Sequence, residues 1–140
     1  MIRLAAKEDA EQLFLLNKAF NGPQETSLEE VKKSLTGNQQ EIVVVAEADG
    51  RIVGFICVQI KQSFCYSDPS AEITEVFVLK KHRRKKLASQ MISFAEAYCA
   101  QYVSIHRITL LTGKENFQAQ ALYHSLGYRK EEEQLLSKYL

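Results

Sequence analysis

Apolar residues recur at helical spacing in the first part of the chain. Residues 8–20 place them three to four positions apart, and acidic residues at the start of this segment suit the positive end of a helix dipole. A capping-box pattern at residues 27–30 predicts a second helix that ends near Leu35. A short apolar segment at residues 2–5 predicts a strand ahead of both helices.

Three β-branched runs follow the two predicted helices. Residues 42–48 and 51–60 are joined by Asp49-Gly50, a dipeptide that is typical of tight hairpin turns. A polar loop then leads to a third run at residues 72–79. The pattern therefore predicts a hairpin followed by a third strand.

The second half of the chain returns to helical spacing. Residues 87–102 carry an apolar stripe, residues 107–112 have the character of a strand, and residues 116–126 predict a helix that Gly127 ends. The tail is expected to add one or two closing strands. This mixture of hairpins and crossovers predicts an α/β fold with a mixed, mostly antiparallel sheet flanked by helices.

Length and composition indicate a single globular domain. The chain has 140 residues, which is long enough to bury a core without metals or disulfides, so residues 1–140 are expected to form one domain. Apolar residues make up 46% and charged residues 25% of the chain. This balance excludes intrinsically disordered and collagen-like proteins.

Charge and cysteine content narrow the class of protein further. The net charge is +1, so no global field directs the chain to nucleic acid or to a membrane. Three cysteines without C-x-x-C spacing indicate reduced thiols, and the histidines share no ligand spacing, so no metal site is expected. No apolar stretch approaches the roughly 20 residues of a spanning helix, and no signal-peptide pattern is present. We therefore expect a cytoplasmic protein.

The most unusual local feature is a basic segment at residues 80–86. It holds 6 of the 18 Lys and Arg residues and lies between a predicted strand and a predicted helix. Backbone N–H groups at a helix N-terminus, together with mobile cations, suit a polyanion such as a pyrophosphate. The end of a strand is also where α/β folds bind ligands. Composition alone is equally compatible with a solvated charge run or a nucleic-acid patch.

A second feature is the predicted helix at residues 116–126. Ala119, Leu122 and Leu126 form an apolar stripe along it, and Tyr123 lies beside this stripe. Spacing alone favours a packing role for Tyr123 over a role as an acid catalyst.

Together the two features resemble the GNAT (Gcn5-related) N-acetyltransferase family, over about residues 1–140. The family's pyrophosphate-loop pattern, Q/R-x-x-G-x-G/A, falls on residues 83–88, with Lys86 where the family usually has its first glycine. If the backbone there needs a positive φ, a Lys costs roughly 1 kcal/mol. The later pattern, N-x-x-A-x-x-L-Y-x-x-x-G-[FY], is matched at each stated position by Asn116, Ala119, Leu122, Tyr123, Gly127 and Tyr128.

The resemblance implies acetyl-CoA as a co-substrate. Its pyrophosphate would lie against amides from Arg84 to Ser89, and its pantetheine arm would pair with the strand end at Phe77 and Val78. Asn116 would contact the cofactor, and the Tyr123 hydroxyl would face its sulfur. The residues implied at the cofactor are Phe77, Val78, Arg83, Arg84, Lys85, Lys86, Leu87, Ala88, Ser89, Asn116, Ala119 and Tyr123.

Acyl transfer to an amine needs a base, donors to an oxyanion and an acid for the leaving thiolate. Glu72 and Glu75 are the candidate bases, and their spacing predicts opposite faces of a regular strand. Alternation favours Glu72, whereas an apolar row around Glu75 would raise the pKa of that carboxyl. The Phe77 or Val78 amide is the expected oxyanion donor, and the resemblance implies Tyr123 as the acid.

The resulting interpretation is an N-acetyltransferase that moves an acetyl group from acetyl-CoA to a primary amine of a small molecule or peptide, by direct attack in a ternary complex. Acidic residues in the first two helices and the 62–70 loop are expected to attract a cationic acceptor. This charge is compatible with a polyamine, an aminoglycoside or a protein N-terminus. The acidic residues in question are Glu25, Glu29, Glu30 and Asp68.

Two alternatives stay open at this point. A non-catalytic acyl-CoA-binding sensor of the same fold is favoured by Lys86 in place of glycine. A nucleic-acid contact at the basic segment is disfavoured because aromatic residues are not interleaved with the cations and an acidic run follows at residues 131–133. Symmetric homodimers are the commonest oligomers of soluble proteins, and this frequency favours a homodimer here.

Overall fold

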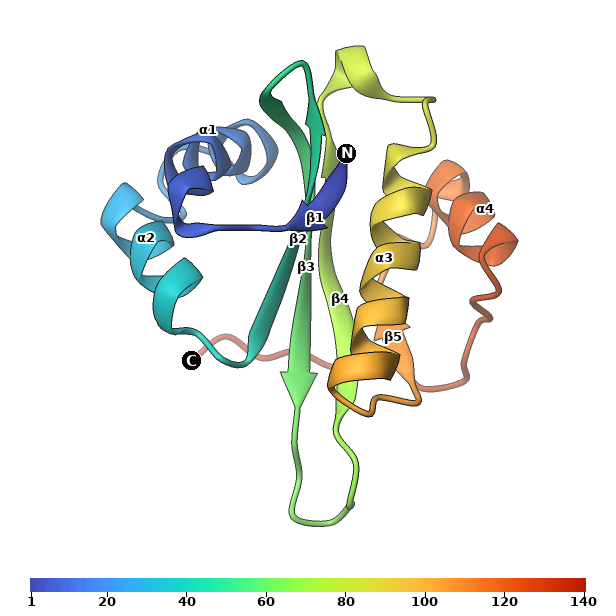
Figure 1. Ribbon diagram of the computed structural model, residues 1–140. Coiled ribbons are helices and arrows are strands. Elements are labelled where there is room, and N and C mark those ends of the chain that lie inside the picture. The colour runs from blue at the N-terminus through green and yellow to red at the C-terminus, as the bar shows by residue number, and fades with distance from the viewer.

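The computed structural model describes residues 1–140 and contains a five-stranded sheet with helices on both faces (Figure 1). The strands lie side by side in chain order. The first four are antiparallel to their neighbours, and the fifth runs parallel to the fourth. The strands are β1 (Ile2–Leu4), β2 (Glu41–Ala48), β3 (Arg51–Lys61), β4 (Ser70–Val78) and β5 (Ile108–Leu110). The predicted mixed, mostly antiparallel sheet is confirmed.

Two helices cover each face of the sheet (Figure 1). On one face lie α1 (Ala10–Asn21) and α2 (Leu28–Gly37), and on the other lie α3 (Leu87–Tyr102) and α4 (Phe117–Ser125). Short 3₁₀ turns, η1 (Lys7–Asp9) and η2 (Lys80–His82), precede α1 and α3. None of these helices combines the length and the apolar character needed to cross a bilayer.

The sheet separates two apolar cores. Successive residues of β2 and β3 point to opposite faces, so Val44 and Ile56 pack toward α3, where Met91 is fully buried. Val45 and Phe55 point the other way, into the core beneath α1. A continuous β-branched sequence such as residues 42–46 therefore reflects a strand that is covered on both sides.

Local sequence signals set several element boundaries. The Ser27 hydroxyl oxygen accepts the Glu30 N–H at 3.2 Å, and the Ser27 hydroxyl donates to the Glu30 carboxylate at 2.9 Å, so the predicted cap of α2 is confirmed. The Asp49-Gly50 hairpin also forms, with a positive φ at both residues.

The predicted closing strands of the tail are wrong. Residues 129–140 form no strand, and their large apolar side chains are exposed. The tail contains no β-branched residue, and its apolar residues do not alternate with polar ones, so it lacks the pattern that a half-buried strand requires. Its acidic run instead lies near β5, where Glu131 and Glu133 approach Arg107 at 3.9 and 4.0 Å.

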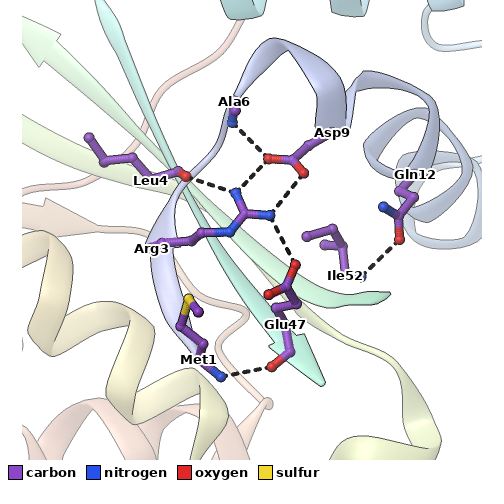
Figure 2. A network of polar contacts seen from close by, with 8 residues as sticks. All are labelled: Met1, Arg3, Leu4, Ala6, Asp9, Gln12, Glu47 and Ile52. Atoms are coloured by element: carbon purple, nitrogen blue, oxygen red, sulfur yellow. Dashed lines mark hydrogen bonds and ion pairs between the residues drawn. The ribbon is translucent and has the colours of Figure 1, made fainter. Parts of the chain in front are cut away.

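A buried ion pair fixes the start of α1 against the sheet (Figure 2). Asp9 is 5% exposed, and its two carboxylate oxygens accept hydrogen bonds from the Arg3 guanidinium at 2.7 and 3.0 Å. The same guanidinium reaches Glu47 on β2 at 3.2 Å, and the Ala6 N–H donates to Asp9 at 2.7 Å. Strand β1, strand β2 and α1 are thereby joined at one point, which positions the helix pair on that face.

The Asp9→Asn variant is expected to lose about 2 kcal/mol of stability at neutral pH, or about 6 °C in Tm. Hydrogen bonds from Arg3 lower the pKa of the Asp9 carboxyl in the folded protein. The stabilisation is therefore complete above the unfolded pKa of about 3.9 and is lost as pH falls through the lower folded pKa. Thermal unfolding from pH 7 to pH 3 measures this dependence.

Glu8→Gln provides the control for Asp9→Asn, because it changes an exposed neighbouring carboxylate. It should leave Tm unchanged. The gap in Tm between wild type and Asp9→Asn should shrink as the solution becomes more acidic. A gap that stays constant down to pH 3 would show that the Asp9 charge does not stabilise the fold.

Candidate active site

Strand β4 contains a β-bulge at its middle. Cys57 on β3 lies opposite Glu75, but the next residue, Val58, lies opposite Ile73. Thr74 is therefore an extra residue on β4 that has no residue opposite it on β3. Residues that lie opposite each other in an antiparallel pair point to the same face. The bulge therefore reverses the alternation of side chains along β4.

The bulge places Glu72 and Glu75 on the same face of the sheet, so the predicted opposite-face arrangement is wrong. Glu72 lies opposite Gln59, which shares a face with Cys57, the residue opposite Glu75. Phe77, two residues after Glu75, packs in the core beneath α1. Both carboxylates consequently point to the side that carries α1 and α2, and the alternation that favoured Glu72 does not apply.

The two carboxylates have different surroundings. Glu72 forms an ion pair with Lys61 on β3. Glu75 has no cation within ion-pairing distance, and burial raises the pKa of its carboxyl, while hydrogen bonds from Asn21 and Thr74 lower it in part. Burial also raises the pKa of Glu41, which lies on the same face and is repelled by the charge of Glu75. A raised carboxyl pKa and the absence of a cation partner suit a general base, so these surroundings favour Glu75 within the predicted pair.

Beyond the bulge, one edge of β4 has no neighbouring strand. Its pairing with β5 ends where Ile73 lies opposite Leu110, so residues 74–78 are unpaired on that side. The Leu79 N–H donates to Val53 on β3 at 2.8 Å, and N–H directions alternate along a strand. The Val78 N–H therefore points to the open edge.

The same alternation turns the Phe77 N–H toward β3. Of the two predicted oxyanion donors, only the Val78 amide lies along the open edge. Gly54 on β3 permits the close approach of the two strands here, since a Cβ at this position would lie 2.8 Å from the Phe77 carbonyl oxygen.

The basic segment of residues 80–86 connects the open edge to α3. The Arg83 Nε donates to the Val78 carbonyl at 2.8 Å, which holds the loop against the end of β4. Arg84 and Lys86 both have a φ of +63°, and Lys86 is the N-cap of α3. Lys86 therefore adopts a left-handed backbone conformation. This conformation costs a lysine roughly 1 kcal/mol more than it would cost a glycine.

Six successive amides of this segment have no acceptor in the chain. The N–H groups of residues 84–89 make no hydrogen bond to backbone or side-chain oxygens, whereas Arg83 and Gln90 on either side donate to carbonyls. Positive φ values within such a run bring successive N–H groups to one concave surface, which binds anions. The helix dipole and the exposed cations add positive potential. The segment fits the pyrophosphate of a nucleotide-containing cofactor.

Helix α4 carries the second predicted motif. Asn116 is its N-cap and accepts the Ala119 N–H at 3.2 Å, so its side-chain oxygen is engaged and its Nδ2 is free to donate. Tyr123 is half-buried against the core beneath α3, and burial raises the pKa of its hydroxyl. That hydroxyl makes no hydrogen bond within the chain, and no buried polar side-chain atom lacks a partner, so solvent reaches it.

Sequence reasoning missed three polar residues beside the predicted carboxylates, namely Asn21, Glu41 and Lys61. Strand register places Glu41 on β2 and Lys61 on β3 near β4, and the packing of α1 on the sheet places Asn21 beside Glu75. Nothing in the local sequence around any of them indicates this.

Three of the four predicted acidic attractors have polar partners of their own. Glu29 pairs with Lys32 at 3.6 Å, and Asp68 lies 3.5 Å from His106. Glu30 belongs to the cap of α2. Their effect on an acceptor stays a prediction.

Comparison with known proteins agrees with this geometry. The acetyltransferase (GNAT) family matches residues 9–128. The catalytic subunit NAA10 of the N-terminal acetyltransferase A complex of Arabidopsis thaliana is 31% identical over 96 residues, which are 64% of this chain and 46% of that protein. The chain thus spans about half the length of this curated relative.

Solved structures share the fold over nearly the whole chain. Ribosomal-protein-alanine N-acetyltransferase from Brucella melitensis biovar Abortus 2308 superposes with a TM-score of 0.82 at 16% identity, covering 99% of both chains. The aminoglycoside acetyltransferase meta-AAC0020, from an uncultured soil metagenomic sample and in complex with sisomicin, gives 0.85 at 20%, covering 100% of this chain and 95% of that one.

A third neighbour carries a ligand that includes the cofactor. AAC(6')-Iy, in complex with the bisubstrate analogue CoA-S-monomethyl-acetylneamine, gives a TM-score of 0.86 at 23% identity and covers 100% of this chain and 97% of that one. Acetyl-CoA is the cofactor that the family uses. The match over most of the chain, together with the basic loop and the open edge of β4, shows that this protein belongs to the acetyltransferase (GNAT) family.

Proposed function

We propose that this protein is an acetyl-CoA-dependent N-acetyltransferase that acts on a primary amine of a small molecule or peptide, by direct attack in a ternary complex. The observation that carries the proposal is the run of six unpartnered amides at residues 84–89, placed where the open edge of β4 ends. An anion site and an unpaired strand edge in succession suit a ligand with a pyrophosphate and an amide-containing arm.

The cofactor-binding residues divide into two groups. The amides of residues 84–89 and the cations of Arg84, Lys85 and Lys86 would hold the pyrophosphate. The Val76 backbone would pair with the pantetheine arm along the open edge, and the Val78 N–H would meet the acyl oxygen, since the Val78 carbonyl already accepts a hydrogen bond from Arg83. The Phe77 N–H points to β3, and the Phe77 side chain packs in the core. Bound acetyl-CoA supplies an acetyl group activated as a thioester.

Three groups of the chain carry the chemistry. Glu75 takes a proton from the acceptor ammonium, directly or through water, and its raised pKa favours this transfer. The Val78 N–H donates to the negative charge that develops on the acyl oxygen. The Tyr123 hydroxyl returns a proton to the departing sulfur, and its raised pKa keeps it protonated at neutral pH.

The acceptor side of the site is polar and acidic. Glu41, Glu72 and Glu75 share the face that carries α1 and α2, and one ammonium, that of Lys61, pairs with Glu72. A cationic amine would be favoured there over an anionic one. Both the aminoglycoside acetyltransferases and the N-terminal acetyltransferase found by comparison are named for amine-bearing substrates.

The proposal is tested by thermal unfolding and by release of coenzyme A. About 1 mM acetyl-CoA should stabilise a site with a ~10 µM Kd by about 2.7 kcal/mol, which raises Tm by several degrees. Thiol release is then followed with a panel of polyamines, aminoglycosides and peptides with free N-termini. If at least one amine releases coenzyme A faster than hydrolysis of acetyl-CoA does, the result supports an N-acetyltransferase.

Each negative result has its own meaning. Stabilisation without thiol release from any amine favours an acyl-CoA-binding sensor of the same fold. No stabilisation at this concentration would show that residues 84–89 do not hold the cofactor, and the proposed activity would then be wrong.

A further inference from the structure

Helix α4 ends in a Schellman motif that brings two tyrosines together. Gly127 has a φ of +96° and donates its N–H to His124 at 3.0 Å, and the Tyr128 N–H donates back to the Tyr123 carbonyl at 3.0 Å. In this motif the residue after the glycine contacts the side chain one turn inside the helix. In the pattern L-Y-x-x-x-G-[FY], the helix end formed by the glycine therefore packs Tyr128 on Tyr123.

The two rings meet edge to face. Their centroids lie 6.3 Å apart with an interplanar angle of 67°, an arrangement that aromatic pairs favour. The Tyr123 hydroxyl makes no hydrogen bond within the chain, so no polar partner aims it. Its direction depends on the contacts of its ring, and Tyr128 supplies one of them.

Tyr128 is itself anchored to α3. Its hydroxyl donates a hydrogen bond to the Glu96 carboxylate at 2.7 Å, across 32 positions in the chain. Glu96 lies on the helix whose N-terminus carries the unpartnered amides of residues 84–89. Figure 1 shows α4 beside α3 on the same face of the sheet. A rigid helix therefore connects the expected pyrophosphate site to the partner of Tyr128.

We infer that Tyr128, held by Glu96, is a positioning residue that sets the direction of the Tyr123 hydroxyl relative to the cofactor site. This inference rests on the proposed function, because it gives Tyr123 the role of proton donor. Loss of the Tyr128–Glu96 bond frees the end of α4 from α3 and lets the Tyr123 ring reorient. Small displacements of a reacting group reduce turnover much more than they reduce binding.

The test compares Tyr128→Phe and Glu96→Ala with Glu96→Gln. The first two remove the hydrogen bond while keeping the Tyr123 side chain, and each should lower kcat about tenfold with KM for acetyl-CoA within twofold of wild type. Glu96→Gln retains an acceptor for the Tyr128 hydroxyl and should keep most of the activity. Tyr102→Phe, a hydroxyl removal at an exposed position of α3, should have no effect.

A double-variant cycle separates positioning from loss of structure. In a Tyr123→Phe background, Tyr128→Phe should cause no further loss of kcat, because the group that it positions is already gone. Losses that multiply, or a single Tyr128→Phe variant with wild-type kcat, would overturn the inference. Thermal unfolding of every variant checks folding. If wild type itself releases no coenzyme A with any amine, the proposed function fails, and the positioning role with it.

Discussion

Tyr123→Phe is expected to lower kcat by about 100-fold while leaving the affinity for acetyl-CoA within twofold of wild type. The substitution keeps the ring, which packs against the core beneath α3, and removes only the hydroxyl. A thiolate must then leave without a proton donor beside it. Burial raises the pKa of Tyr123, so the wild-type hydroxyl is protonated through the neutral range and available to donate. Steady-state thiol release and thermal shift with acetyl-CoA measure the two quantities separately.

Tyr102→Phe is the matched control for Tyr123→Phe, since the same atom is lost from a tyrosine exposed on α3. Its kcat should equal that of wild type. If Tyr123→Phe retains full turnover, Tyr123 is a packing residue, as the spacing along α4 alone indicates. If it instead loses cofactor binding with kcat unchanged, its hydroxyl serves affinity and does not take part in the proton transfer.

Glu75→Gln is expected to lower kcat/KM for the amine by about 100-fold at pH 7. The acceptor ammonium, with a pKa of about 10.4 for a Lys-like amine, must lose a proton before it attacks. The deficit should shrink toward pH 10, because the amine then loses this proton without a base. A rate–pH profile of wild type and variant measures this change.

The stability of Glu75→Gln distinguishes a catalytic loss from a folding defect. Burial raises the folded-state pKa of Glu75 above its unfolded value, so ionisation of this carboxyl lowers the stability of the fold as pH rises above the unfolded pKa, and the full loss is reached above the folded pKa. Replacing it with a neutral isostere should therefore leave Tm at pH 7 unchanged or raise it. A large fall in Tm would mean that the activity loss cannot be assigned to the base.

Glu72→Gln makes the same chemical change on the same face of β4 and tests which carboxylate is the base. Glu72 is paired with Lys61, so a smaller effect on kcat/KM is expected, with little dependence on pH. The opposite ranking, with Glu72→Gln the more damaging variant, would identify Glu72 as the base. Equal small effects would show that neither carboxylate carries the proton.

Much of the fold could be predicted from short segments of sequence. The capping box at Ser27, the Asp49-Gly50 hairpin and the glycine that ends α4 each depend on contacts between residues a few positions apart. The basic loop and the α4 motif were recognisable for the same reason, because the backbone conformation of each is determined locally. The loop pattern alone shows that Lys86 stands where the family usually has a glycine, and the structure gives Lys86 a positive φ, which glycine adopts at lower cost.

The arrangement of the acceptor side could not be predicted in this way. Alternation along an isolated strand predicts that Glu72 and Glu75 point to opposite faces, and the prediction fails because β4 gains a residue at Thr74 relative to β3. A bulge is a property of the pairing between two strands, and neither strand's own sequence specifies it. Pairing across the sheet also brings Lys61 to Glu72.

The sequence by itself determined the order of the elements as far as α4 and the family motifs, since these depend on neighbours along the chain. Tertiary structure alone decided that the two carboxylates share a face, that the Val78 amide lies on the open edge, and that Glu96 anchors Tyr128. These contacts join residues far apart in sequence. Their geometry depends on strand register and helix packing, which form only when the whole domain folds.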